Sequence, residues 1–146
     1  MALPTGSGTE TLHSHIFQDV DAAQTLIFGV QHHVYTVLSI IVYCNALNAT
    51  TDIFDIKMKG HDGHAGVENI TIVIARGNIQ AEETYVWNDK FSFNGCAPAS
   101  TNVLSASEQV AIAAQTSTNV QELQFGMSST ADDFDIIVTY LDQDWT

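Results

Sequence analysis

The chain has 146 residues, of which 17 are acidic and four are basic, and its net charge is −13. This length predicts one domain whose core needs no disulfides or metals. Nucleic acids and anionic membranes both bind basic surfaces, so the charge excludes them from the expected partners. Because only 14% of the residues are charged, most of the surface is uncharged and polar, which favours packing against neighbouring subunits.

The first residues differ in composition from the rest of the chain. Residues 1–9 combine Pro, Gly, Ser and Thr with few core-forming side chains and predict an N-terminal arm. The arm lacks the basic and apolar segments of a signal peptide, so we expect no secretory signal. The longest apolar run, Val37 to Cys44, is too short to span a bilayer. Residues 10–146 contain no internal repeat and predict a single domain.

Alternating apolar and polar residues predict strands along this domain. In the first strand, the alternating sets are His13, His15 and Phe17 on one side and Leu12, Ser14 and Ile16 on the other. We expect the second set to face the core, because it contains the two aliphatic residues.

The following segments are rich in β-branched and aromatic residues. Gln24 to Val30 predicts a short strand, and Val34 to Cys44 predicts the longest one. In residues 53–59 the apolar side chains alternate with charged ones, so the apolar set faces the core. That set is Phe54, Ile56 and Met58.

The second half of the chain continues the pattern. Asn69 to Arg76 is apolar without alternation, which predicts a strand buried on both sides. Thr84 to Trp87 and Phe91 to Phe93 predict strands on either side of a tight turn at Asn88-Asp89. The core-facing residues predicted for the last strand are Phe134, Ile136, Val138 and Tyr140.

These segments amount to roughly eight to ten short strands. Ser105 to Gln115 is the best helical candidate, but its apolar Val110 and Ile112 are two residues apart, which favours a strand. We therefore predict an all-β fold: an antiparallel, jelly-roll-like β-sandwich with an extended N-terminal arm. Cys44 lies within an apolar strand and predicts a buried thiol. Whether Cys44 and Cys96 form a disulfide is not decided by their spacing.

Two groups of histidines could ligate a metal. His13 and His15 place both imidazoles on one strand face, which suits zinc or copper, but spacing identifies no third ligand. His61, Asp62 and His64 lie in a Gly-rich loop that could hold a metal or exchange protons. Ordinary polar surface is the favoured interpretation of both groups, so we predict no metal site and no cofactor.

Acidic residues gather at several places in the sequence. They are Asp19 and Asp21, then Asp132, Asp133 and Asp135, then Asp142 and Asp144. Carboxylate-rich loops can bind calcium, but the spacing of an EF-hand is absent. A solvated acidic face is the favoured interpretation, and bound calcium is the alternative.

The sequence contains none of the common nucleophile, phosphate-binding or zinc-protease motifs. Glu82 and Glu83 are adjacent, so on a strand they face opposite ways and do not form a catalytic pair. We therefore predict no catalytic residues and no enzymatic activity.

A few apolar residues are candidates for an interface with other subunits. Trp145 either packs back onto the sandwich or docks into a neighbouring subunit, because aromatic side chains are favoured at interface centres. Leu3 and Pro4, in the arm, are the other residues that we expect at an interface. For Trp87 we expect core or sheet-surface packing. Tyr85 and Trp87 are the candidates for the alternative, a glycan-binding platform.

Three stretches of the chain share their order and character with a known group of proteins. They are Thr11 to Phe17 (TLHSHIF), Val34 to Met58 (VYTVLSIIVYCNALNATTDIFDIKM) and Glu83 to Phe93 (ETYVWNDKFSF). Together they resemble the small β-sandwich virion proteins of tailed bacteriophages, which include capsid cement or decoration proteins and some tail-associated proteins. The resemblance carries an architecture and a role, and no individual site residues.

This resemblance implies a structural virion protein, most simply a capsid cement protein that stabilises the shell through non-covalent contacts. The implied partners are the major capsid protein or another virion protein, together with further copies of the chain, with a trimer favoured. The implied location is the virion, after synthesis in the host cytoplasm. Tail association with receptor or glycan binding is the alternative. A metal-dependent enzyme using the histidines and a cellular carbohydrate-binding domain are more distant ones.

Overall fold

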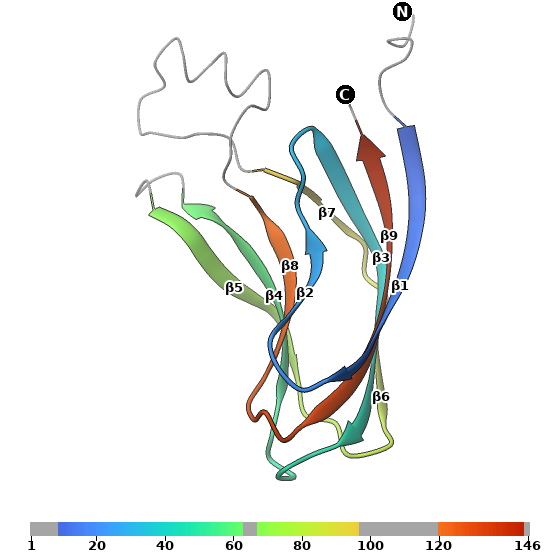
Figure 1. Ribbon diagram of the computed structural model, residues 1–146, viewed down its shortest axis with the longest axis vertical. Helices are drawn as coiled ribbons and strands as arrows, with labels where there is room; N and C mark the ends of the chain where they lie inside the picture. The colour runs from blue at the N-terminus through green and yellow to red at the C-terminus, as the bar shows by residue number, and fades with distance from the viewer. Residues whose placement is uncertain (1–8, 63–66, 97–119, 145–146) are drawn as a thin grey trace, which may run out of the picture.

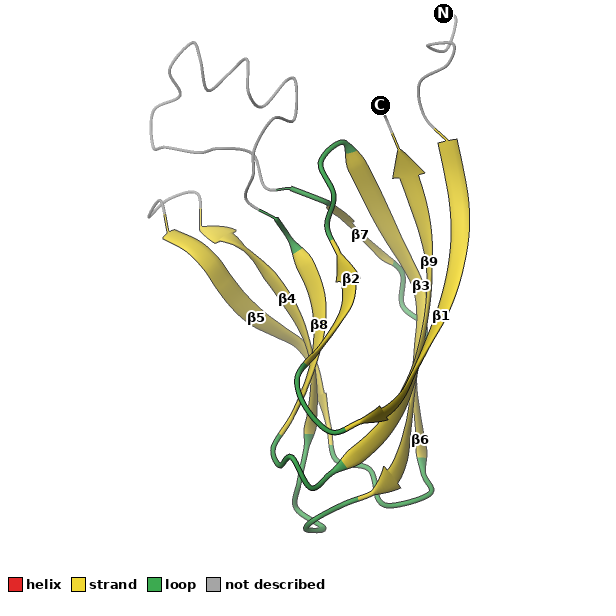
Figure 2. Ribbon diagram, viewed as in Figure 1, coloured by secondary structure: helices red, strands yellow, loops and turns green. Residues whose placement is uncertain are grey.

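The structure is a computed structural model that describes residues 9–62, 67–96 and 120–144. Within these ranges the chain forms strands, turns and loops and no helix (Figure 1; Figure 2). The strands are β1 (Thr9–Val20), β2 (Gln24–Phe28), β3 (His33–Ala46), β4 (Phe54–Asp62), β5 (Val67–Gly77), β6 (Thr84–Trp87), β7 (Phe91–Asn94), β8 (Glu122–Met127) and β9 (Asp133–Asp144). The predicted all-β fold is confirmed.

Several predictions fall on other parts of the chain. Residues 1–8, which form most of the predicted arm, and the segment Ser105–Gln115 lie outside the described residues. The division into an arm and one domain stays a prediction. In the part of the chain that the structure covers, no helix is long and apolar enough to cross a membrane.

The strands form two antiparallel sheets that face each other (Figure 1). Sheet A has the order β1-β9-β3, with β6 and β7 both paired to β3, and sheet B has the order β2-β8-β4-β5. Along β3, Ile40 pairs with Trp87 and Val37 pairs with Phe91. Residues 88–90 therefore interrupt one edge of sheet A, and the predicted tight turn at Asn88-Asp89 is wrong. Both flanking segments continue along the same partner strand.

The pairing between strands is nested along the sequence. β4 pairs with its neighbour β5, β3 pairs with β6 and β7, β2 pairs with β8, and β1 pairs with β9. The chain thus behaves as one long hairpin that doubles back between β4 and β5 and is then rolled into two sheets. This order is that of a jelly roll, so the predicted architecture is confirmed.

Alternate residues of both sheets meet in one core. Its fully or almost fully buried members are Val20, Leu26, Ile27, Tyr35, Val37, Ile40, Val42, Cys44, Phe54, Ile56, Leu123, Phe125, Phe134, Ile136, Val138 and Tyr140. The predicted inward sets of β4 and β9 are confirmed, with Met58 partly buried against the core. Cys44 is buried as predicted, and Cys44 and Cys96 are both free thiols.

Two predictions of burial are wrong. In β1 the set that contains His13, His15 and Phe17 faces inward, and Leu12 and Ile16 are exposed at 64% and 59%. The Asn69–Arg76 segment forms most of β5, which is the edge strand of sheet B and is not buried on both sides. An edge strand has a neighbour on one side only, so apolar residues there remain open to solvent.

The two sheets diverge toward the end at which β1 begins and β9 ends (Figure 1). Three backbone hydrogen bonds form a series at this level, and the one between Gln121 and Gly95 joins sheet B to sheet A. Gly29 N–H donates to the Gln121 carbonyl at 2.9 Å, Gln121 N–H donates to the Gly95 carbonyl at 2.9 Å, and Gly95 N–H donates to the His33 carbonyl at 2.8 Å. They join the ends of β2, β7 and β8 to the start of β3 and hold the two sheets together.

Candidate functional site

Histidine, tyrosine and aspartate side chains line the inner face of sheet A beyond the apolar core. His13 and His15 come from β1, His33 and Tyr35 from β3, and Tyr140, Asp142 and Asp144 from β9. The strand register brings them together, because His13 pairs with Tyr140 and His33 pairs with Asp144. The predicted common face of the two β1 histidines is therefore confirmed, although it is the inner face.

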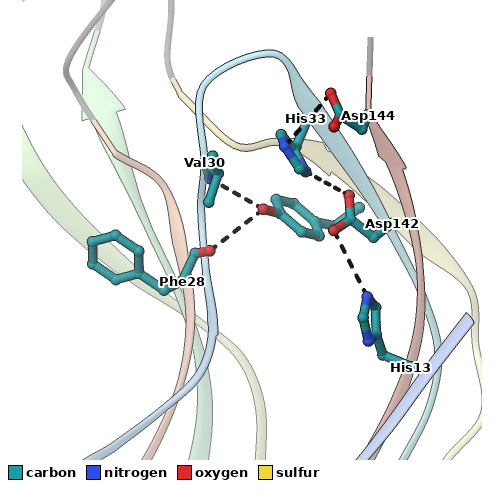
Figure 3. A network of polar contacts seen from close by, with 7 residues as sticks. His13, Phe28, Val30, His33, Asp142 and Asp144 are labelled. Carbon is teal, nitrogen blue, oxygen red and sulfur yellow. Dashed lines mark hydrogen bonds and ion pairs between the residues drawn. The ribbon is translucent and has the colours of Figure 1, made fainter. Parts of the chain in front are cut away.

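Asp142 is the centre of this network (Figure 3). Its Oδ1 lies 2.7 Å from His33 Nδ1, and its Oδ2 lies 3.9 Å from His13 Nε2. The side chains of His33 and Asp142 are each 18% exposed, so water screens this contact only partly. His33 Nε2 is also 3.7 Å from Asp144 Oδ1. The network orients both imidazoles, and the sequence did not identify His33 as a member of it.

Tyr35 joins this network to sheet B. Its hydroxyl oxygen accepts a hydrogen bond from Val30 N–H at 3.1 Å, and its O–H donates to the Phe28 carbonyl at 3.5 Å. Burial, and then the negative charge of Asp142, raise the pKa of Tyr35 to about 12. The same two causes raise the pKa of Tyr140. Both phenols therefore stay neutral at physiological pH, and Tyr35 can always donate to Phe28.

Replacing Tyr35 with phenylalanine tests this connection. The ring would still fill the core, but Val30 N–H would lose its acceptor. We expect Tyr35→Phe to lower the free energy of unfolding by about 1–2 kcal/mol, the cost of an unsatisfied, partly buried donor. Urea denaturation of both proteins measures the difference. An unchanged midpoint would show that water replaces the phenol without loss.

Chemically, this network is a set of oriented hydrogen-bond donors and acceptors on a sheet face. Carboxylate-bound imidazoles can transfer protons or support metal ligands. However, among residues 9–62, 67–96 and 120–144, the one group whose three ligand atoms all lie within 4.8 Å of one another is elsewhere, at Asp19, Asp133 and Asp135. The prediction of no metal site at His13 and His15 stays a prediction.

That acidic group brings together two of the clusters seen in the sequence. Asp19 ends the regular part of β1, with a backbone φ of 53°, and its N–H donates to Asp135 Oδ1 at 3.0 Å. Asn45 Nδ2 donates to Asp133 Oδ1 at 3.3 Å. Acidic groups on exposed surfaces often lie together without an ion, so the geometry fits the solvated face as well as the calcium alternative.

Asp132, beside this group, has a different environment. It is 1% exposed, and its Oδ1 accepts a hydrogen bond from Asn48 N–H at 2.8 Å. Its Oδ2 is buried without a donor. Burial is the main cause that raises the pKa of Asp132, and the neighbouring Asp52 carboxylate raises it further. A proton on Oδ2 would remove the buried charge and let Oδ2 donate to the neighbouring Asp52 carboxylate.

The raised pKa of Asp132 predicts that the free energy of unfolding falls as pH rises. The folded state binds the Asp132 proton more tightly than the unfolded state does, so this stabilisation is complete below the unfolded pKa and is lost as pH rises through the folded pKa. We expect Asp132→Asn, which keeps the acceptor for Asn48, to increase the free energy of unfolding at pH 7 by about 1–2 kcal/mol, the usual cost of an unsatisfied buried polar atom. At pH 3.5 the gain should largely vanish. Urea denaturation at both values measures it, and a gain that does not change with pH would contradict the assignment.

The structure describes only some of the remaining predicted site residues. His61 belongs to β4, and its two ring nitrogens are buried without a hydrogen-bond partner. His64 lies outside the described residues, as do the predicted interface residues Leu3, Pro4 and Trp145. Tyr85 and Trp87 are partly buried against the core, so they do not form an exposed glycan platform.

The outer face of sheet A is the feature that the sequence did not indicate. We define it by two rows of side chains that run across the strands. The aliphatic row is Ile16, Ile137, Ile41 and Val86, which are direct register partners from β1 through β9 and β3 to β6. The hydroxyl row beside it is Ser14, Thr139 and Ser39.

This face is open and uncharged in its centre. Ile16 and Val86, at the two ends of the aliphatic row, are exposed at 59% and 54%. The hydroxyls of Ser14 and Thr139 are 3.2 Å apart and hydrogen bonded to each other. Leu12, exposed at 64%, pairs with Leu141 on the far side of the hydroxyl row. A continuous uncharged surface of this kind is unusual for a chain with a net charge of −13.

No protein-family model matches the chain. No curated protein is significantly similar to it in sequence. Among solved structures, a protein of the Bacillus endospore appendages, described as disulfide-linked pili, superposes with a TM-score of 0.43 and 6% identity, covering 100% of this chain and 97% of that one.

Two capsid structures of infectious bursal disease virus are also similar. A chain of the T13 particle has a TM-score of 0.41 and 6% identity and covers 96% of this chain. A chain of the T=1 particle has a TM-score of 0.39 and 7% identity and covers 95% of it. In both cases this protein spans 36% of the capsid chain. Likenesses with TM-scores below 0.5 do not assign the chain to a family.

Proposed function

We propose that the protein is a structural component of a virion, of the capsid cement or decoration type, that acts through non-covalent contacts and not through catalysis. Its partners are the major capsid protein or another virion protein, together with further copies of itself. It is made in the host cytoplasm and joins the particle there. The resemblance seen in the sequence supports this role and favours a trimer.

The outer face of sheet A is the observation that carries the proposal. The rest of the molecule is rich in carboxylates, which are costly to desolvate at an interface. The aliphatic row and the hydroxyl row need little desolvation, and Ile16 and Val86 each expose more than half of their surface. A neighbouring subunit that covers these two rows gains apolar burial at about 25 cal/mol per Å².

The test is to locate the chain in particles of the virus that encodes it. Mass spectrometry of purified particles measures its copy number, and a cryo-EM reconstruction gives its position. Repeated copies over the junctions between shell subunits, with sheet A covered, are the expected result. Copies confined to the tail or to a fibre tip would favour the tail-associated alternative. Absence of the chain from purified particles would overturn the proposal.

A further inference from the structure

The charges of sheet A are divided between its two halves. β3, β6 and β7 contain no Asp, Glu, Lys or Arg. The outward-facing acidic residues in the described strands of this sheet all lie on β1 and β9, and they are Glu10, Asp19, Asp133 and Asp135. β1 and β9 therefore form the acidic half of the outer face, and the strands of the other half are uncharged. Four charged residues border that other half outside its strands: Glu82 and Glu83 beside Cys44, and Asp89 and Lys90 between β6 and β7. The aliphatic row crosses both halves.

We propose that this face binds the same face of a second copy. The two copies are related by a two-fold axis that lies in the interface, parallel to the strands and midway between β9 and β3. The axis exchanges β9 with β3 and exchanges β1 with β6 and β7. Each acidic half then lies over the strands of the other copy that carry no Asp, Glu, Lys or Arg. This inference rests on the proposed function and names the partner of the same face.

The register of the strands makes the two halves complementary. Ile137 and Ile41 are register partners within one chain, so the axis places Ile137 over Ile41 of the second copy. Ile16 and Val86 stand at the two ends of the aliphatic row, so Ile16 lies over Val86 of the second copy. Asp135 pairs with Tyr43 in the sheet and would face the Tyr43 hydroxyl of the second copy. Apolar side chains thus meet apolar ones, and a carboxylate meets a donor.

A second copy is favoured over other partners because the face is complementary to itself. Four strands about 4.8 Å apart, over about eight residues of length, offer about 500 Å² per subunit. Two such faces bury about 1,000 Å² in total, the lower end for a specific interface, so we expect a reversible dimer with micromolar affinity. A two-fold contact also requires an even number of copies, unlike the trimer that the resemblance favours.

Sedimentation equilibrium of the full chain and its variants tests the contact. Val86→Glu would place a carboxylate over the acidic half of the second copy and should weaken association at least tenfold or so. The matched control is Ile72→Glu on β5, where a residue exposed at 60% lies in sheet B. This control should leave the dissociation constant unchanged. Circular dichroism of both variants reports whether they fold.

A rescue variant separates this contact from a loss of folding. Ile16 and Val86 lie on opposite edges of sheet A, about 14 Å apart, too far to form an ion pair within one chain. Across the proposed axis they face each other, so the double variant Ile16→Lys/Val86→Glu should recover the dimer to within about threefold of the unmodified chain. Restored association in the double variant supports the axis.

Three results would overturn the inference. They are a monomeric chain at high micromolar concentration, a sedimentation mass of three chains, and a double variant that associates no better than Val86→Glu alone. A monomer that is nevertheless found in purified particles would leave the proposed function standing and remove only the dimer. A chain that forms the dimer but is absent from purified particles would overturn the proposed function and leave the dimer standing.

Discussion

Gly95→Ala is expected to lower the free energy of unfolding by about 3 kcal/mol. A Cβ at this position would overlap the carbonyl oxygen of Val30 and would also lie 2.7 Å from its backbone nitrogen. Both are backbone atoms, so they move only if the β2–β3 connection moves with them. That movement would strain the hydrogen bonds that link Gly95 to His33 and to Gln121, the second of which joins the two sheets.

Gly126→Ala is the matched control. Its Cβ would meet the end of the Lys57 side chain, with Nζ at 2.8 Å, and a flexible lysine can move aside. We expect this variant to change the free energy of unfolding by less than about 1 kcal/mol. Urea denaturation followed by circular dichroism compares the two. Equal stability of the two alanine variants would mean that the junction at Gly95 adapts, and that it does not hold the sheets together.

Phe54→Ala is expected to lower the free energy of unfolding by about 3–5 kcal/mol, the usual cost of removing a buried aromatic ring. Phe54 is fully buried at the start of β4. Its ring centroid lies 5.1 Å from that of Tyr85 in sheet A and 5.7 Å from that of Phe125 in sheet B. The ring therefore fills the space between the sheets, and the alanine variant would leave a cavity there.

Phe28→Ala provides the comparison for this prediction. Phe28 is 60% exposed at the end of β2, so its truncation removes little buried surface. We expect a loss below about 0.5 kcal/mol. Thermal and urea denaturation of both variants measure the contrast, and a Phe54→Ala loss as small as that of Phe28→Ala would show that the core repacks around the missing ring.

Much of the core was predictable from alternation alone. In β4 the residues between Phe54, Ile56 and Met58 are charged, and charged residues are almost never buried without partners. Only one face of that strand could therefore be inward. The free thiol of Cys44 followed in the same way from its place in an apolar strand.

The alternation of β1 did not decide which face is inward. Both of its residue sets mix polar and apolar side chains, so a period of two defines two faces without ranking them. The structure turns His13 and His15 inward because Tyr140 and Asp142 of β9 offer them ring and carboxylate contacts. The alternating pattern correctly predicted a strand at β1, but the set expected to face the core, Leu12, Ser14 and Ile16, faces outward.

The His33–Asp142 contact depended on pairing over a long distance in the chain. The two residues are 109 positions apart, and they meet because β9 inserts between β1 and β3. Nested pairing also places β5 at an edge, where its aliphatic residues stay exposed. Neither result can be derived from local periodicity, because periodicity describes one strand and not its neighbours.

The sequence by itself determined the all-β class, the two-layer architecture and the inward residues of the strands whose opposite face is charged. Local alternation and turn residues are sufficient for these properties, because they are decided within one strand. Only the tertiary structure decided the strand order, the inward face of β1 and the continuous aliphatic row from Ile16 to Val86. These depend on register between strands that are distant in the chain, and register becomes defined only when the whole sheet is assembled.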